Sequence, residues 1–223
     1  EGAVHCPPSR LEVHDSTDLD ACAPIDLVLV AVKSYHAEDA AVQVKGLLER
    51  SPSALVLPLL NGIDTPDVFG RVLGSHRQVL AGLCGIISAV AEPGVVHHTA
   101  AHPYIVFGEL SNERTARCSA VADALADGTR GMSVRWPDDI HVEVWTKLLF
   151  IAPYSGLGAL TRAPCGAMLR EERVAALLQA GMEEVAAVAR AHGVALPADT
   201  VATCMRRLTA LPPELLALTV LFL

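Results

Sequence analysis

An almost wholly apolar segment at residues 25–32 (IDLVLVAV) constrains the fold of this chain more than any other feature. It is rich in β-branched residues, a pattern typical of a strand buried on both faces, as in a parallel sheet. Residues 36–50 follow with apolar side chains at helical spacing, and residues 54–60 form a second apolar run. A strand, a helix and a strand joined by short connections predict a right-handed βαβ unit and an α/β layer.

The rest of the chain has two parts with different sequence patterns. Up to residue 137 strand and helix patterns alternate: a helix that opens at Thr65-Pro66, a strand over 78–87, two short strands at 95–96 and 104–107 that can pair as a hairpin, a helix over 112–126 and a strand over 132–136. Beyond residue 139 the periodicity is helical, over 139–152, 165–192 and 198–211, with Gly193 at a C-cap position. We therefore predict a Rossmann-like α/β domain over 1–137 and an all-α domain over 138–223.

The composition excludes several classes of protein. The net charge is −8 and no run of five basic residues occurs, which argues against a nucleic-acid-binding surface. With 52% hydrophobic residues the chain is globular, and its apolar stretch at 215–223 is too short to span a membrane. The first residues have no signal-peptide pattern. The six cysteines form no CxxC pair, so we expect free thiols in a reducing cytoplasm.

Polar or small residues follow each of the first three predicted strands. Lys33 comes directly after the first strand, and the Asn61-Gly62 turn follows the second. Ligands of open parallel sheets bind at the carboxyl ends of strands, so these positions are candidates for a binding site. A solvated lysine and an ordinary turn are the alternative interpretation. Gly82, Gly85 and Ser88 in and after the third strand either let a ligand lie against the backbone or permit close packing.

Lys147 lies within an apolar helical pattern, WTKLLFI. Partial burial of a lysine favours the neutral amine and suits it to proton transfer. The alternative is a lysine whose stem covers the helix while its ammonium reaches water.

Three histidines, His97, His98 and His102, raise the question of a metal site. The spacing from His98 to His102 would place two imidazoles on one face of a helix. The neighbouring residues favour strands, and neither a carboxylate nor a cysteine is adjacent as a third ligand. We therefore expect no metal.

Taken together, these segments resemble the ketopantoate reductase (2-dehydropantoate 2-reductase) family almost end to end. The resemblance is carried by DLVLVAVKSYHAEDA with its terminal lysine, VLPLLNGIDT with its Asn-Gly turn, AGLCGIISAVAEPGVVHH followed by FGE, DIHVEVWTKLLFIAPYSGLGALTRAP, and EEVAAVARAHGVALP. Thr203-Cys204-Met205 is similar to the Ser-Ser-Met of the family.

The resemblance implies NADPH-dependent reduction of 2-dehydropantoate, or a related 2-keto acid, to (R)-pantoate in pantothenate biosynthesis. Lys147 would be the catalytic proton donor and would also hold the substrate, with Ser155 and Thr203 as further substrate-binding residues. Lys33, Asn61 and Ser88 would contact the cofactor, which makes 1–137 a partial dinucleotide-binding domain. The helical domain over 138–223 would bind the substrate and provide the surface of a possible homodimer.

The chain departs from the family pattern in two ways. Ile151 and Cys165 stand where the family has asparagine, and Ser155 replaces a third asparagine, which leaves the exact 2-keto acid open. No GxGxxG turn occurs, and both ends look cut, so we expect that the first βαβ unit and the end of the helical domain are missing. The alternative function is a non-catalytic remnant or helical assembly module that has lost cofactor binding.

Overall fold

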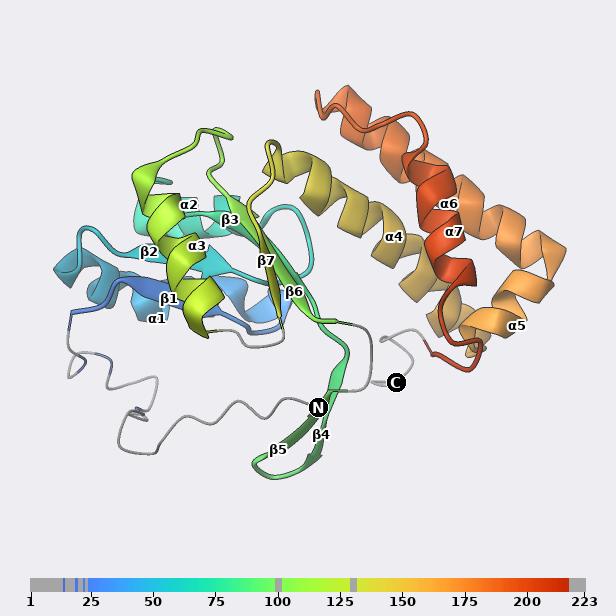
Figure 1. The fold of residues 1–223 in the computed structure, drawn as a ribbon, viewed down its shortest axis with the longest axis horizontal. Helices are drawn as coiled ribbons and strands as arrows, with labels where there is room; N and C mark the ends of the chain where they lie inside the picture. Colours follow the sequence, from blue (N-terminus) through green and yellow to red (C-terminus); the bar gives the residue numbers. More distant parts are fainter. Residues whose placement is uncertain are drawn as a thin grey trace. The chain divides into compact units, whose positions relative to one another are not determined.

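The computed structural model describes residues 24–98, 102–128 and 132–216, together with His14, Leu19 and Cys22. The chain forms two compact units, Glu1–Ile140 and His141–Leu223, and each is considered by itself (Figure 1). The first unit has an α/β architecture and the second is mostly helical, which confirms the predicted fold class. Among the described residues no helix has the length and apolarity required to cross a membrane.

The first unit is built on two parallel strands, β1 (Leu27–Val30) and β2 (Leu55–Pro58), joined through the helix α1 (Ala37–Arg50). Every residue of β2 is buried, because its two faces belong to different cores. Val56 packs with α1 and with α2 (Thr65–Leu73), whereas Leu55 and Leu57 pack on the other face. The predicted βαβ unit is therefore present.

Strand β1 differs from the prediction of a strand buried on both faces. It pairs with β2 on one side, and the described part of the chain provides no strand on its other side. On one face of β1 Leu29 is 47% exposed, whereas Val30 on the other face is buried in the core beside α1. A continuous apolar run predicts the strand itself but not which of its faces this chain covers.

A three-stranded sheet in the order β3-β6-β7 completes the α/β part. Strand β6 (Tyr104–Gly108) pairs antiparallel with β3 (Ala81–Gly85) and parallel with β7 (Ser133–Arg135), and α3 (Ala116–Gly128) packs against it. A parallel bridge between Val56 and Val79 connects the approach to β3 with β2.

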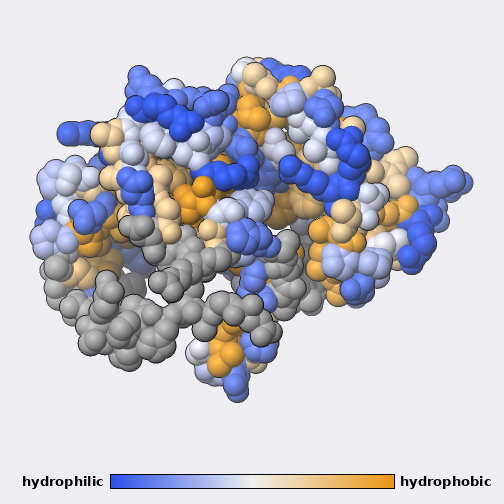
Figure 2. Space-filling model, in the orientation of Figure 1, coloured by the Kyte–Doolittle hydropathy of each residue, from blue (hydrophilic) through white to orange (hydrophobic). Residues whose placement is uncertain are grey.

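The predicted hairpin between residues 95–96 and 104–107 is wrong, because each of these strands has another partner. Strand β5 (Val95–His98) pairs with β4 (Ser88–Glu92), and β6 pairs with β3 and β7. The β4–β5 hairpin stands out from its unit with hydrophobic side chains on its surface (Figure 2), where the cross-strand partners Val90 and Val96 are 72% and 65% exposed.

The described part of the second unit contains four helices around one apolar core. They are α4 (Ile140–Thr161), α5 (Cys165–Arg170), α6 (Glu172–Ala191) and α7 (Thr200–Thr209). Its most buried members include Leu149, Leu178, Met182 and Leu208. Gly193 ends α6 with a φ of 80°, in the left-handed region that favours glycine, and its N–H donates to the carbonyl of Arg190 at 2.9 Å.

Two helix predictions need correction. Helix α4 continues nine residues beyond the predicted end at 152, through Pro153, which packs against Gly181 of α6. The predicted single helix over 165–192 is two helices, because Glu171 has an extended backbone and separates α5 from α6. At Pro153 the packing against another helix overrides the local signal of the proline.

Candidate active site

Lys33 and Asn61 occupy matching positions beyond the two parallel strands. Val30 is the register partner of Pro58, and each candidate follows its strand's last paired residue by three positions. The N–H of Leu59 donates to the carbonyl of Val30 at 2.9 Å and extends the pairing toward this edge. The structure thus brings the two exposed residues to the same carboxyl edge of the sheet, where parallel strands present ligand sites.

The backbone at this edge is shaped by local turns. The carbonyl of Lys33 accepts a hydrogen bond from His36 N–H at 2.9 Å, which opens the short 3₁₀ helix Ser34–His36 before α1. Gly62 has a φ of 116°, a conformation that residues with side chains rarely adopt. The Asn61-Gly62 turn therefore requires its glycine, and Asp64 Oδ1 lies 3.1 Å from the point that a Cβ on Gly62 would occupy.

Ser88 is not part of this edge. It begins β4 and is paired with His98 in the exposed β4–β5 hairpin, a separate two-stranded sheet. Gly82 and Gly85 also have a packing explanation. A Cβ at Gly82 would collide with the side chain of Leu57, and a Cβ at Gly85 would collide with the ring of Tyr104. Side chains of the first unit, rather than a ligand, therefore occupy the space over both glycines.

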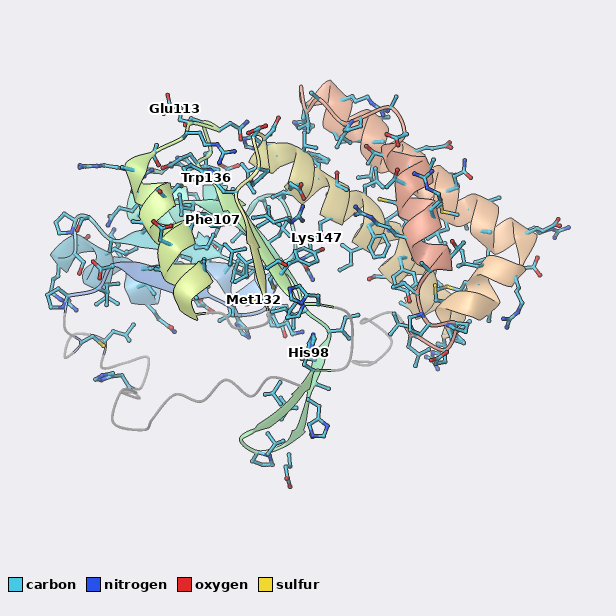
Figure 3. The ribbon with its side chains drawn as sticks, in the orientation of Figure 1. His98, Phe107, Glu113, Met132, Trp136 and Lys147 are labelled. Atoms are coloured by element: carbon cyan, nitrogen blue, oxygen red, sulfur yellow. The ribbon has the colours of Figure 1, made fainter. Side chains whose placement is uncertain are left out.

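Lys147 lies in the first half of α4 and is half-buried (Figure 3). Its neighbours Trp145 and Leu149 are both buried in the helical core, and the Trp145 ring lies 5.7 Å from the ring of His192. Because α4 is one helix through residue 161, Ile151 and Ser155 follow Lys147 at i+4 and i+8 on the same ridge. This ridge presents an amine, an apolar side chain and a hydroxyl in succession.

Thr203 and Cys165 belong to other helices of the second unit. The Thr203 hydroxyl donates to Asp199 Oδ2 at 3.1 Å and accepts from Arg206 Nη2 at 2.7 Å, so its hydrogen bonds stay within α7 and the residue before it. Cys165 is buried at the start of α5, with its Sγ 3.7 Å from the carbonyl of Leu208. Burial raises the pKa of this thiol, which keeps it protonated and unreactive.

A hollow of about 530 Å³ lies between α6 and α7, and none of the predicted site residues lines it. His97 and His98 are neighbours on β5 and point to opposite faces of that strand, whereas His102 lies beyond residues 99–101, which are outside the described residues. In the part of the chain that the structure describes, no three metal-ligating side chains gather.

Family models and known proteins match most of this chain. The family model described as "Ketopantoate reductase PanE/ApbA" matches residues 4–112, and the model of its C-terminal domain matches residues 139–216. The chain is 34% identical over 174 residues to the uncharacterized oxidoreductase YkpB of Bacillus subtilis, a match that covers 78% of this chain and 55% of YkpB. It is 30% identical over 186 residues to a 2-dehydropantoate 2-reductase of Halobacterium salinarum, covering 83% and 59%.

A solved structure agrees with these relatives. The PanE/ApbA family ketopantoate reductase of Ralstonia eutropha superposes with a TM-score of 0.75 at 35% sequence identity, covering 88% of this chain and 61% of that protein. The chain therefore spans between 55% and 61% of the lengths of these three proteins.

Proposed function

Because this chain belongs to the ketopantoate reductase family, we propose that it is part of an oxidoreductase that reduces the ketone of a 2-keto acid to an alcohol, with NADPH as the hydride donor. The substrate we propose is 2-dehydropantoate, which would yield (R)-pantoate. The name of the Halobacterium relative supports this choice, whereas the name of the Bacillus relative specifies no substrate.

The observation that carries the proposal is the position of Lys147. It is half-buried in α4 beside buried core residues and heads a ridge that continues to Ile151 and Ser155. A lysine held in this way has a restricted side chain and limited contact with water. Both properties favour a proton donor, because charge stabilisation is stronger in a water-poor site than in bulk water.

Lys147 supplies the proton of the proposed reaction. The nicotinamide cofactor, when bound, supplies the hydride that adds to the ketone carbon. The Nζ ammonium of Lys147 donates its proton to the carbonyl oxygen as negative charge develops there. The ketone becomes a secondary alcohol, and the lysine is left as a neutral amine that regains a proton from solvent.

The carboxyl edge of β1 and β2 fits a dinucleotide. Lys33 offers a cation for a phosphate, and Asn61 offers an amide that can donate and accept. We assign Lys33 and Asn61 to cofactor binding on this basis. Ser88, which begins the β4–β5 hairpin, has only the family resemblance in favour of its proposed cofactor contact.

The ridge of α4 also bears on the choice of substrate. Ser155 can hydrogen-bond a carboxylate or a hydroxyl, but Ile151 cannot. If the ridge faces the substrate, Ile151 contacts an apolar part of it. A 2-keto acid that carries a methyl group in place of the hydroxymethyl group of 2-dehydropantoate would then be reduced at least as well.

The test is a steady-state assay of the complete protein that contains this chain, following the loss of reduced-nicotinamide absorbance. The substrates are 2-dehydropantoate, its methyl analogue and a 2-hydroxy acid as a negative control, each with NADPH and with NADH. We expect reduction of at least one keto acid, with NADPH preferred. An enzyme that consumes neither cofactor with any of the keto acids would overturn the proposal.

A further inference from the structure

Tyr104, the first residue of β6, places its aromatic ring over β3, the strand that lies beside β6 in Figure 1. Its register partner is Gly85, the last residue of β3. A Cβ on Gly85 would collide with the Tyr104 ring and would lie 2.7 Å from its hydroxyl oxygen, so the phenol lies directly above the Gly85 backbone. The absence of a side chain at Gly85 therefore makes room for this ring.

The ring lies at the same edge of the α/β unit as Lys33 and Asn61. The Sγ of Cys84 lies 3.6 Å from the carbonyl of Leu59, so the ends of β3 and β2, which run parallel, are adjacent. Asn61 follows Leu59 by two residues, and Lys33 is at the matching position beyond β1. The phenol, above β3, is thus one strand from Asn61 and two strands from Lys33, or about 5 and 10 Å at ordinary strand spacing.

The ring is held from both neighbouring strands. Side chains alternate along β6, and Ile105 and Phe107 point into the core formed with α3, so Tyr104 belongs to the opposite face of the sheet. The guanidinium of Arg135 on β7 lies 5.2 Å from the centre of the Tyr104 ring. Because β7 and β3 flank β6, a cation from one strand and the glycine backbone of the other fix the ring.

The hydroxyl of Tyr104, in contrast, has no hydrogen-bond partner within the described part of the chain. Among the described residues no buried side-chain oxygen lacks a partner, so this hydroxyl is accessible rather than enclosed. Tyr154 differs, since its hydroxyl donates to the carbonyl of Leu215 at 3.3 Å. A phenol that is fixed at its ring and open at its hydroxyl can donate one hydrogen bond to a ligand and accept another.

The chemistry of a nicotinamide dinucleotide fits this edge. Its phosphates suit the Lys33 cation, and it also carries uncharged ribose hydroxyls and a carboxamide. These neutral groups match the amide of Asn61 and the phenol of Tyr104, because all of them donate and accept hydrogen bonds. A dinucleotide is long enough to contact Lys33 and the phenol at once, across about two strand spacings.

We infer that Tyr104 is a further cofactor-binding residue: its hydroxyl hydrogen-bonds an uncharged polar group of the nicotinamide cofactor, a ribose hydroxyl or the carboxamide, at the edge where Lys33 binds a phosphate. The inference rests on the proposed function, in which NADPH is the hydride donor. Gly85 and Arg135 act indirectly, because they set the position of the ring.

The test is a fluorescence titration of the complete protein with NADPH, which measures a Kd independently of turnover. Tyr104→Phe removes the hydroxyl and keeps the ring over Gly85. We expect its Kd to rise about three- to tenfold, the effect of losing one hydrogen bond. Tyr154→Phe is the matched control, because it removes the same atom from the helical unit, and its Kd for NADPH should stay unchanged.

A second variant tests the position of the ring. Gly85→Ala pushes the ring from its place above β3, so it should weaken NADPH binding in the otherwise unchanged protein. The same substitution should have a smaller effect on the Kd in the Tyr104→Phe background, where the hydroxyl is already absent. Thermal unfolding checks that each variant is folded, and Tyr104→Phe alone still decides the question if Gly85→Ala is not.

An unchanged Kd for Tyr104→Phe would overturn the inference and leave the proposed function intact. An equal effect of Gly85→Ala in both backgrounds would overturn it too, because the hydroxyl would then not act from its place above β3. If the unchanged complete protein does not bind NADPH at all, the proposed function itself is wrong. The two failures are therefore distinguishable in the same titrations.

Discussion

Glu109 and Arg117 face each other through a two-pronged ion pair. The Arg117 Nε and Nη2 atoms donate to the two carboxylate oxygens of Glu109, and Nη1 donates to the carbonyl of Arg77. Glu109 directly follows β6, Arg117 lies in the first turn of α3, and Arg77 precedes β3. The guanidinium of Arg117 therefore connects three parts of the α/β unit.

Arg117→Ala should lower the free energy of unfolding by about 1–3 kcal/mol, because it removes the charged partner of the buried Glu109 carboxylate and leaves the side chains of Thr115 and Cys118. The arginine side chain is 38% exposed, so water offsets part of the loss. Arg114→Ala is the matched control, since the Arg114–Asp138 pair is exposed and should contribute less than about 1 kcal/mol. Urea unfolding measures both, and equal losses would contradict the assignment.

The same pair predicts a pH dependence of stability. The hydrogen bonds from Arg117 hold the pKa of Glu109 below its ordinary value of 4.5. As the pH falls, the Glu109 carboxylate of the unfolded chain therefore binds a proton before that of the folded chain does. The stabilisation by the ion pair is complete above the ordinary pKa of 4.5, and it is lost as the pH falls through the lower pKa of the folded state. Unfolding free energies between neutral pH and about pH 3 should fall less steeply for Arg117→Ala than for the unchanged protein. Parallel slopes would show that Glu109 does not contribute.

Lys147→Ala should reduce turnover of the 2-keto acid by about 10²–10⁴, the range typical for loss of a general acid. The cofactor Kd should change little, because we assign cofactor binding to other residues. Lys45→Ala, on the exposed side of α1, is the control and should leave turnover unchanged. Near-normal turnover of the Lys147 variant would exclude it from the mechanism.

Two glycine substitutions should have opposite effects on stability. Alanine at Gly82 would collide with the buried side chain of Leu57, so Gly82→Ala should cost about 1–3 kcal/mol. Gly156 lies within α4 and has no atom within 4 Å of an added Cβ, so Gly156→Ala should stabilise the protein by about 0.5–1 kcal/mol. Thermal unfolding compares the pair. An unchanged stability of the Gly82→Ala variant would contradict the packing explanation of that glycine.

The cysteines should differ in their reactivity toward an alkylating agent. Burial raises the pKa of Cys118 to about 11 and also raises the pKa of Cys165 and Cys204, so these three remain buried thiols. Cys22 and Cys84 are partly exposed and should react first at mildly alkaline pH. Mass spectrometry of peptides after brief labelling gives the order, and early modification of Cys118 would indicate local opening of α3. Cys6 lies outside the described residues.

The parts of the fold that could be predicted from the sequence are those in which apolar residues recur at regular spacing. The strand and helix at residues 25–50 and the left-handed Gly193 follow from spacing and from glycine's conformational freedom. The partner of β5 does have a local signal, because the two-residue turn Pro93-Gly94 joins β5 to β4 and Gly94 has a φ of 80°. The predicted pairing with residues 104–107 is wrong because it ignores this hairpin loop. The continuation of α4 through Pro153, in contrast, involves Gly181, a residue of another helix.

The candidate site also contains some residues whose positions could be predicted from the sequence and others whose positions could not. Lys33 and Asn61 could be placed at one sheet edge, since both directly follow recognisable strands and parallel strands end together. Ser88 could not be placed correctly from the sequence, because a hairpin rather than a continued strand follows β3. Tyr104 gives no local signal either: its neighbours Gly85 and Arg135 are distant in sequence, and only the folded sheet brings them together.

The contact between the rings of Trp145 and His192, which are tilted by 31°, has a practical consequence. The chain has two tryptophans, and the other, Trp136, stacks on Phe107 in the α/β unit. Intrinsic fluorescence thus contains one emitter from each unit. A Trp136→Phe protein would report the melting of the helices alone, and a Trp145→Phe protein that of the sheet. Comparing the two denaturation curves would reveal whether the units unfold together or in separate steps, without any external label.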